Sequence, residues 1–465
     1  MSERFDVIVL GSGPGGYVAA IKAAQLGKNV ACIEKAEVGG VCLNWGCIPT
    51  KALIKNADMW HDIQKAGNMG FSMGENSFNY PEIVQRSRDT AAKLSKGIDF
   101  LFKKNNVTLI RGNGKFNSEK QLDVTDSEGN LVGTYEAEAI IIATGARPRT
   151  IPGIEIDGKK IISSKEALVL DKIPESITVI GAGAIGVEFA YIFNTFGSQV
   201  TIVEALPQIM PNEDAEIAKE AARALKKQKI KINDGTMVKA INTDSEKIQT
   251  IIEKKGKEKS LESDMVLMAI GVQPNTENIG LENIGVETDR GWITVDENYK
   301  TNVDGIYAIG DVIGGACLAH VASTEGINAV EKICGHDAGL VNYKAVPGCT
   351  YCHPQVASVG MTEAKALEQG FELKIGKCHF RAIGKAIAID EIAGMVKVIF
   401  DAKTGILIGG HIVGAEATEL LAELVLAVDK QMTFDQMKTV IHAHPTLSET
   451  VMEAIHDAYD EAIHV

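Results

Sequence analysis

A glycine-rich unit that occurs twice constrains the fold of this chain more than any other feature. The first copy begins with the apolar run 5–10 and turns at Gly11, Gly13 and Gly16. An Ala-rich helical pattern follows, and a second apolar run ends at Glu34. This order is typical of a dinucleotide-binding βαβ unit, in which the turn and the helix N-terminus face a pyrophosphate and the acidic residue bonds a ribose hydroxyl. We call residues 5–34 the first glycine unit.

The same order recurs in residues 176–204, the second glycine unit. Its turn carries Gly181, Gly183 and Gly186, its acidic residue is Glu204, and each position lies 170 residues after its counterpart. Two such units predict two dinucleotide sites, or one site and a degenerate copy; turns that only pack a helix on a sheet are the alternative. A carboxylate at Glu204 favours NAD, because it bonds the free 2′-hydroxyl and repels the 2′-phosphate of NADP.

Two cysteines five positions apart, Cys42 and Cys47, follow the first glycine unit. Five residues of a regular helix rise about 7.5 Å, whereas a disulfide needs Cα atoms within roughly 7 Å, so a bridge requires a distorted turn. Gly46 and Pro49 permit an irregular backbone. We interpret the pair as a redox-active disulfide. Two buried thiols, or half of a metal site, are alternatives that the spacing leaves open.

Composition excludes several classes of function. The 465 residues suggest roughly three domains, and 45% hydrophobic with 23% charged residues is ordinary for a globular chain. The net charge of −14 disfavours nucleic acid and anionic membranes as partners. No apolar run reaches the ~18 residues of a membrane span, so we expect no membrane insertion. The first residues show no leader pattern, and eight dispersed cysteines suit a reducing compartment, so we expect a cytoplasmic protein.

The second glycine unit is bracketed by two similar strand ends. Residues 143–148 and 269–274 each close an apolar run with Gly and then Pro, so the second unit is predicted to be inserted into the first domain. Asp311 then ends a strand pattern, where ligands of open α/β sheets bind, although a structural turn would give the same pattern. From Pro347 the pattern becomes α+β, with strands at 395–400 and 406–413 and helices at 417–429 and 447–462.

A histidine and a carboxylate stand close together near the end of the chain. His444 precedes Pro445, which fits a first helical turn, and Glu449 follows five residues on. Such a pair predicts a general base oriented by its carboxylate, and a capped helix with a surface histidine is the alternative. Cys349 and Cys352 lie in a spacing like that of haem attachment, but we assign neither haem nor any metal and expect reduced thiols there.

Taken together, these motifs resemble the flavin-dependent pyridine nucleotide disulfide oxidoreductases over the whole chain. The resemblance implies an α/β fold with two Rossmann-like dinucleotide-binding domains, one inserted in the other, and a C-terminal α+β dimerisation domain. The corresponding division is 1–148 for FAD, 149–273 for NAD, 274–345 completing the FAD domain, and 346–465 for the interface.

The resemblance also implies where the cofactors bind. The FAD residues would be Gly11, Gly13, Gly16, Glu34, Lys51, Gly114, Thr144, Gly145, Asp311 and Ala319. The NAD residues would be Gly181, Gly183, Gly186, Glu204, Val238 and Gly271. Lys51 and Glu188 match a pair that lies beside the flavin in the family.

Catalytic roles follow from the same resemblance. Cys42 would exchange with the substrate, Cys47 would face the flavin, and His444, held by Glu449, would act as the base from the partner chain of a homodimer. The likeness is strongest to members that oxidise protein-bound dihydrolipoamide to lipoamide and reduce NAD, so the implied partners are lipoyl domains of 2-oxo acid dehydrogenase or glycine cleavage complexes. A glutathione-type reductase, or a mainly docking subunit, is the alternative.

Two residues depart from the family pattern. Trp45, between the two cysteines, is bulkier than the small aliphatic residue expected there. Cys352 stands where Thr or Ser is expected. Neither departure alters the assignment, but both bear on rate and redox potential.

Overall fold

The computed structural model describes residues 3–72 and 74–464, and the chain divides into two compact units. Unit 1 comprises Met1–Ala52, Glu82–Arg149 and Gly271–Val341. Unit 2 comprises Leu53–Pro81, Thr150–Ile270 and Asn342–Val465. The interleaving means that the chain leaves unit 1 and returns to it, as the two similar strand ends predicted. The finer division at 148, 273 and 345 stays a prediction.

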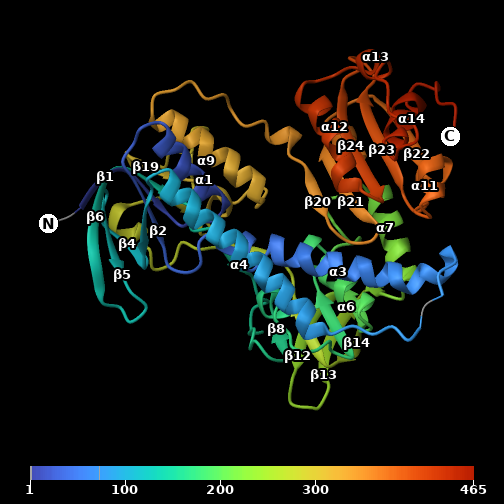
Figure 1. Cartoon of the computed structure of the whole chain (residues 1–465), viewed down its shortest axis with the longest axis horizontal. Coiled ribbons are helices and arrows are strands. Elements are labelled where there is room, and N and C mark those ends of the chain that lie inside the picture. Colours follow the sequence, from blue (N-terminus) through green and yellow to red (C-terminus); the bar gives the residue numbers. More distant parts are fainter. Residues whose placement is uncertain (1–2, 73, 465) are drawn as a thin grey trace. The chain divides into compact units, whose positions relative to one another are not determined.

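Unit 1 is built, in its described residues, on a seven-stranded sheet of order β3-β2-β1-β6-β5-β4, with β19 beside β6 (Figure 1). The pairing is parallel between β3, β2, β1, β6 and β19. It is antiparallel between β6 and β5 and between β5 and β4. β2 is buried at every residue, because one of its faces packs in a core with α1 and α9 and the other in a core with β4, β5 and α8. The bounds are β1 Glu3–Leu10, α1 Pro14–Gln25, β2 Val30–Glu34, α2 Gly40–Asn44, α4 Tyr80–Lys104, β3 Thr108–Arg111, β4 Asn113–Ser118, β5 Gln121–Thr125, β6 Leu131–Ile142, β7 Ala146–Pro148, β16 Val272–Pro274, α8 Leu281–Ile284, β17 Thr288–Asp289, β18 Trp292–Ile293, β19 Ile306–Ala308, η2 Gly310–Ile313 and α9 Ala319–Ile333. Helix α3, Cys47–Lys65, begins in unit 1 and continues into unit 2 from Leu53 on.

The first half of unit 2 contains a parallel sheet of order β11-β10-β9-β15-β8 and an antiparallel sheet β12-β13-β14. The second glycine unit supplies β9, α6 and β10, so both predicted βαβ units are confirmed as parallel pairs joined by a helix. The bounds are η1 Ala66–Met69, β8 Ile161–Ile162, α5 Ser164–Ala167, β9 Ser176–Ile180, α6 Ala184–Thr195, β10 Gln199–Val203, α7 Ala215–Lys227, β11 Lys231–Asn233, β12 Met237–Asn242, β13 Ile248–Lys254, β14 Lys257–Ser263 and β15 Met265–Met268.

The C-terminal part of unit 2 is an antiparallel sheet of order β20-β21-β24-β23-β22 with helices packed against it. α12 packs on β21 and β24, and α14 packs on β22 and β23, which encloses one apolar core. The predicted α+β class is therefore confirmed. The bounds are η3 Tyr343–Ala345, β20 Gly348–Thr350, β21 Gln355–Gly360, α10 Glu363–Glu368, β22 Leu373–His379, η4 Phe380–Ala382, α11 Gly384–Ala388, β23 Met395–Asp401, β24 Leu407–Gly414, α12 Ala417–Asp429, α13 Phe434–Met437 and α14 Glu449–Asp457.

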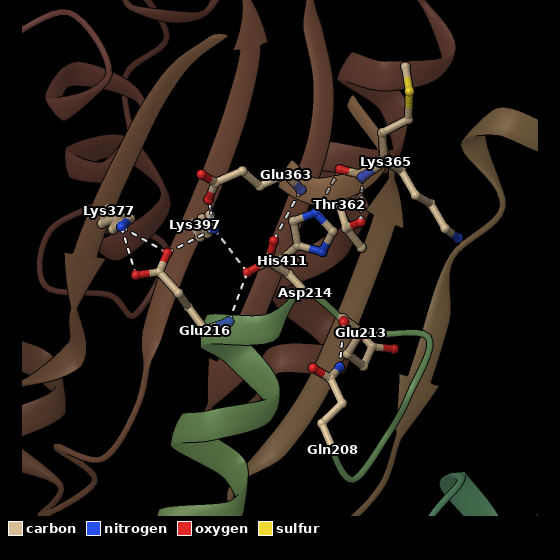
Figure 2. A network of polar contacts seen from close by, with 11 residues as sticks. Gln208, Glu213, Asp214, Glu216, Thr362, Glu363, Lys365, Lys377, Lys397 and His411 are labelled. Atoms are coloured by element: carbon tan, nitrogen blue, oxygen red, sulfur yellow. Dashed lines mark hydrogen bonds and ion pairs between the residues drawn. The ribbon is translucent and has the colours of Figure 1, made fainter. Parts of the chain in front are cut away.

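A buried lysine ties α7 to this C-terminal sheet. Lys397 on β23 is 1% exposed, and its Nζ lies 2.9 Å from Asp214, 2.8 Å from Glu216 and 2.6 Å from Glu363 (Figure 2). Asp214 is the N-cap of α7 and accepts from the backbone of Glu216 at 3.1 Å. Burial alone would lower the pKa of Lys397, but its bonds to the carboxylates outweigh burial and raise that pKa to about 12. The ammonium therefore stays charged in the interior.

Within the described residues, we find no helix with the length and apolar character needed to cross a membrane.

Candidate active site

The first glycine turn places an open helix N-terminus beside the carboxyl ends of β1 and β2. Gly11 has φ +105°, and a Cβ on Gly16 would lie 1.9 Å from the carbonyl oxygen of Gly11, so both positions require glycine. Gly13 is the N-cap of α1 and provides no side-chain cap, and a Cβ there would meet nothing within 4 Å. The first amides of α1 thus have no side-chain acceptor, which fits a bound pyrophosphate.

Glu34 closes this turn from the end of β2. Its Oε2 accepts from the backbone N of Ser12 at 2.8 Å and from the Ser12 hydroxyl at 2.6 Å, and its Oε1 accepts from the N of Ala36 at 2.8 Å. A carboxylate offers about four acceptor positions, so one remains for a ribose hydroxyl.

The second glycine turn has the same construction. Gly181 has φ +99°, a Cβ on Gly186 would lie 2.0 Å from the carbonyl oxygen of Gly181, and Gly183 is an N-cap without a side-chain bond. Glu204 accepts from the N of Ala182 at 2.7 Å and from the N of Leu206 at 2.8 Å. About two acceptor positions of this carboxylate remain, which fits a ribose with both hydroxyls free.

The cysteines lie on two different helices. Cys42 is in α2 and Cys47 is the first residue of α3, and the helix is interrupted at Trp45 and Gly46. The expected distorted turn is confirmed, whereas Pro49 lies inside the first turn of α3 and not in the break. We call residues 39–51 the cysteine segment. It begins directly beside the first glycine turn, since Gly39 N donates to Ser12 O at 3.0 Å.

Cys42 and Cys47 are free thiols that lie within hydrogen-bonding reach of one another. Hydrogen bonding to Cys47 and then burial raise the pKa of the Cys42 thiol, while the charge of Lys51 acts in the opposite direction. Both cysteines are half-buried. A thiol that stays protonated cannot react as a thiolate until a base removes its proton. The same requirement applies to a dithiol substrate that approaches Cys42.

The other predicted FAD residues all lie in unit 1, on several of its elements. Lys51 lies in α3, Gly114 in β4, and Ala319 is the first residue of α9. Thr144 donates to the Asn275 carbonyl at 2.8 Å, next to Gly145 with φ +69°. Asp311 lies in η2, just after β19, and burial raises its pKa.

The remaining predicted NAD residues lie in unit 2 or at its boundary. Val238 is in β12, and Gly271, with φ +105°, begins the last stretch of unit 1. Glu188 in α6 is 4% exposed and accepts from the backbone N of Tyr351 at 3.0 Å.

His444 and Glu449 are brought together as expected. His444 Nδ1 lies 2.8 Å from Glu449 Oε1, and Glu449 Oε2 accepts from the N of Thr446 at 2.9 Å. The bond from His444 and then that from Thr446 lower the pKa of Glu449. An ionised Glu449 can only accept, so His444 carries its proton on Nδ1 and presents Nε2, on a side chain that is 79% exposed, as a base.

The local prediction around this histidine was partly wrong. α14 begins at Glu449, so Pro445 lies before the helix, and residues 444–448 form a loop. The loop persists because Glu449 bonds back to Thr446 and His444 and so holds the chain outside the helix. Glu449, and not His444, stands at the helix start.

Among the described residues of the same domain, two further hydrogen-bonded His–Glu pairs were not predicted from the sequence. His442 Nε2 lies 2.8 Å from Glu423, and His464 Nδ1 lies 2.7 Å from Glu453. The bond to Glu423 raises the pKa of His442, but that side chain is only 6% exposed. His464 is 67% exposed, so it is the natural comparison for His444.

Cys349 is half-buried in β20, and Cys352 is buried and donates to the Pro354 carbonyl at 3.1 Å. No group of three or more His, Cys, Asp or Glu side chains that could hold a metal occurs among the described residues.

Known proteins resemble the chain over its whole length. A family model described as pyridine nucleotide-disulphide oxidoreductase matches residues 5–326, and one for the dimerisation domain of the same family matches 346–455. Relatives named dihydrolipoyl dehydrogenase include that of Rhizobium etli, 47% identical, and that of Zymomonas mobilis, 46% identical, each with both chains fully covered. The mitochondrial enzyme of Pisum sativum is 42% identical over all of this chain and 93% of its own.

Solved structures also match the chain over nearly its whole length. LpdA of Mycobacterium tuberculosis matches with a TM-score of 0.89 and 27% identity over 98% of this chain and 99% of its own. The HOCl-induced flavoprotein disulfide reductase RclA of Escherichia coli, as its Cu(II) complex, matches with a TM-score of 0.87 and 28% identity over 98% and 99%.

Proposed function

The chain belongs to the pyridine nucleotide-disulphide oxidoreductases, and we propose that it oxidises dihydrolipoyl groups to the lipoyl disulfide through Cys42 and Cys47, with NAD as the acceptor. Relatives of that activity align from end to end at 42–47% identity, which supports the choice of substrate. The single observation in the structure that carries the chemistry is the contact of Cys42 with Cys47 at a helix break beside the first glycine turn.

FAD and NAD are the cofactors of this family. The uncapped N-terminus of α1 with Glu34 would hold the FAD pyrophosphate and ribose, and the corresponding residues of the second glycine unit would hold NAD. Bound FAD supplies a path for two electrons from the cysteine pair to NAD, where they arrive as hydride. The remaining steps belong to side chains of this chain.

The dithiol step is a thiol–disulfide exchange. A substrate thiolate attacks the Cys42 sulfur of the Cys42–Cys47 disulfide, which releases Cys47 as a thiolate; the second substrate sulfur then displaces Cys42 and closes the lipoyl disulfide. The substrate loses two electrons and two protons, and the cysteine pair gains the electrons. One proton must leave the substrate before the attack, and we assign its removal to His444, oriented by Glu449.

The dimerisation domain places this protein among the homodimeric members of the family. We infer that His444 serves the partner chain's cysteines, as the family resemblance implies. The physiological substrate is then the lipoyl domain of a 2-oxo acid dehydrogenase or glycine cleavage complex in the cytoplasm. Reduction of NAD by the purified protein with an isolated dihydrolipoyl domain tests this partner, and a reaction with free dihydrolipoamide alone would contradict it.

Turnover of dihydrolipoamide with NAD and with NADP tests the main proposal. We expect activity with NAD, because Glu204 has free acceptor positions for an unmodified ribose. Preference for glutathione and NADPH would favour the glutathione-type alternative, and loss of all turnover in a flavin-containing protein would favour a docking subunit.

Two histidine variants test the base. His444→Gln should lower dithiol oxidation by roughly 10²–10⁴-fold, the range of general base catalysis, while reduction of an artificial acceptor by NADH continues. His464→Gln removes the other exposed His–Glu pair and should leave dithiol oxidation within about twofold of wild type. If His464→Gln caused the larger loss, the base would have to be reassigned.

A further inference from the structure

Trp45 and its neighbours on α4 form a contact that none of the assigned functions uses. The guanidinium carbon of Arg88 lies 4.0 Å from the centroid of the Trp45 ring, a cation–π distance. The same guanidinium donates to the carbonyl of Asn44, the last residue of α2. On its other edge, the Trp45 indole N–H donates to Glu37 at 3.3 Å.

These contacts act on the helix break itself. The last carbonyls of a helix lack partners within the helix, and Arg88 supplies one for α2 at the residue where α2 ends. Trp45 has φ −138°, outside the helical region, and its flat ring against Arg88 holds that conformation in place. Two more bonds from α4 fix the flanks of the segment: Ser95 donates to Val38 O at 2.6 Å, and Ser87 donates to Pro49 O at 2.9 Å. The position of Cys42 relative to Cys47 therefore depends on α4.

On the basis of the proposed redox role of the cysteines, we propose that Arg88, stacked on Trp45, is a positioning residue that fixes the break between α2 and α3 and so sets the redox potential of the Cys42–Cys47 pair. The equilibrium concerned is the oxidation of two thiols to a disulfide with release of two protons and two electrons. A fixed break keeps the two sulfurs together in the dithiol and favours closure of the disulfide. A loosened break lowers that advantage, so the disulfide becomes easier to reduce.

The expected size follows from the contacts removed. Loss of one cation–π contact and one charge-assisted hydrogen bond should lower the equilibrium constant for disulfide formation by about tenfold, which equals a potential about 30 mV more positive for a two-electron couple. The identity of residue 45 then has a physical reason: a small aliphatic side chain would offer Arg88 no ring to stack on.

The experiment measures the Cys42–Cys47 equilibrium in dithiothreitol redox buffers, by alkylation and mass spectrometry of the FAD-containing protein. Arg88→Ala should shift the equilibrium about tenfold toward the dithiol. Arg88→Lys should show most of the same shift, because lysine keeps the charge but cannot stack on Trp45 and cap α2 at the same time. Arg86→Ala is the matched control, because Arg86 lies two residues away on α4 and its carbonyl contact at 3.5 Å is to Ala52, beyond the cysteine segment. An unshifted Arg88→Ala, or an equal shift in Arg86→Ala, would overturn the proposal.

A second variant covers the case in which Arg88→Ala does not fold. Trp45→Val removes the stacking partner and leaves Arg88 in place, and it should shift the equilibrium in the same direction by a smaller factor; no shift would again overturn the proposal. In the double variant the two effects should combine to less than their product, because both remove the same contact. The dithiothreitol equilibrium needs neither lipoyl substrate nor NAD, so it tests this inference independently of the proposed function. Failure of the proposed function would instead show as absent dihydrolipoamide turnover in the wild-type protein.

Discussion

The two glycine units share one pattern of backbone hydrogen bonds around the glycine turn and the acidic residue, and the chain that follows differs between them. In both, the first glycine N donates to a carbonyl of the second strand at 2.8 Å, and the carboxylate accepts from the backbone N of the residue after that glycine and of the residue two positions beyond itself. The corresponding residues are Gly11 and Gly181, Ile33 and Val203, Ser12 and Ala182, Glu34 and Glu204, and Ala36 and Leu206. A small set of backbone bonds thus builds the same turn twice.

The two glycine units differ in the segment that follows the acidic residue and in what that segment contacts. After Glu34 the chain enters the cysteine segment, which α4 holds through Arg88. After Glu204 it enters α7, whose N-cap Asp214 bonds the buried Lys397 (Figure 2). The first copy is therefore joined to the proposed redox centre and the second to an ion network on the dimerisation domain. On the proposed assignment of cofactors, the binding geometry lies within the repeat, whereas chemistry and anchoring lie outside it.

Lys397→Met breaks the anchoring of the second copy and should have the largest effect on stability. Removing one partner of a buried ion pair costs about 3–5 kcal/mol, and Asp214, at 2% exposed, would be left buried without its cation. Urea unfolding at fixed protein concentration measures the loss. Lys403→Met is the control, because Lys403 pairs with Glu372 on the surface, where a pair is worth about 0–1 kcal/mol. Equal losses in the two variants would contradict the role of the network.

The same variant has a defined pH dependence. Burial alone would raise the pKa of Asp214, but its bonds to Lys397 and to the backbone of Glu363, together with the charge of Lys397, outweigh burial and hold that pKa below its ordinary value of 3.8; the pKa of Glu216 is lowered in the same way, by Lys377 and Lys397. A carboxylate whose pKa is lowered in the folded chain stabilises the fold at pH values above its ordinary pKa. That stabilisation is lost as the pH falls through the pKa of the folded chain. The difference between wild type and Lys397→Met should therefore be full at pH 7 and shrink below about pH 4.

Gly16→Ala disrupts the first glycine turn alone, and Gly186→Ala disrupts the second alone. A Cβ would meet the Gly11 carbonyl oxygen at 1.9 Å or that of Gly181 at 2.0 Å, and such overpacking costs about 1–3 kcal/mol. We expect Gly16→Ala to lose FAD, and Gly186→Ala to keep FAD but to use NADH poorly, as measured by flavin absorbance and by NADH oxidation with an artificial acceptor.

Gly97→Ala is the control for both glycine variants, since a Cβ on Gly97, in α4, meets nothing within 4 Å. It should be neutral or slightly stabilising, because Ala favours a helix. If Gly186→Ala lost FAD as completely as Gly16→Ala, the two copies would not serve separate cofactors.

The parts that sequence predicts are those set by neighbours along the chain. The βαβ units depend on glycines and an acidic residue within one short span, and α12 occupies the predicted residues Ala417–Asp429 because its apolar pattern is strong. Arg88 and Lys397 could not be found this way. Their partners are 44 and 183 residues distant, and each looks like any other cation of an amphipathic helix or a strand. The misplaced start of α14 has a different, local cause: Glu449 bonds back to His444 and to the backbone N of Thr446, and these bonds override the proline signal.

Ser12→Ala removes the one polar side chain by which the first glycine turn, residues 11–16, differs from the second, residues 181–186, and should have the smallest effect. The buried Ser12 hydroxyl donates to Glu34 at 2.6 Å and accepts from Gly39 N at 3.4 Å, whereas the second copy has Ala182 at this position. One hydrogen bond of this kind is worth about 1 kcal/mol. The backbone N of residue 12 still bonds Glu34, so FAD affinity should change little while the urea midpoint falls. A large loss of FAD would show that the hydroxyl, and not the shared backbone pattern, holds the first site together. A small loss of stability alone would mean that Ser12 serves the junction with the cysteine segment, which only the first copy has.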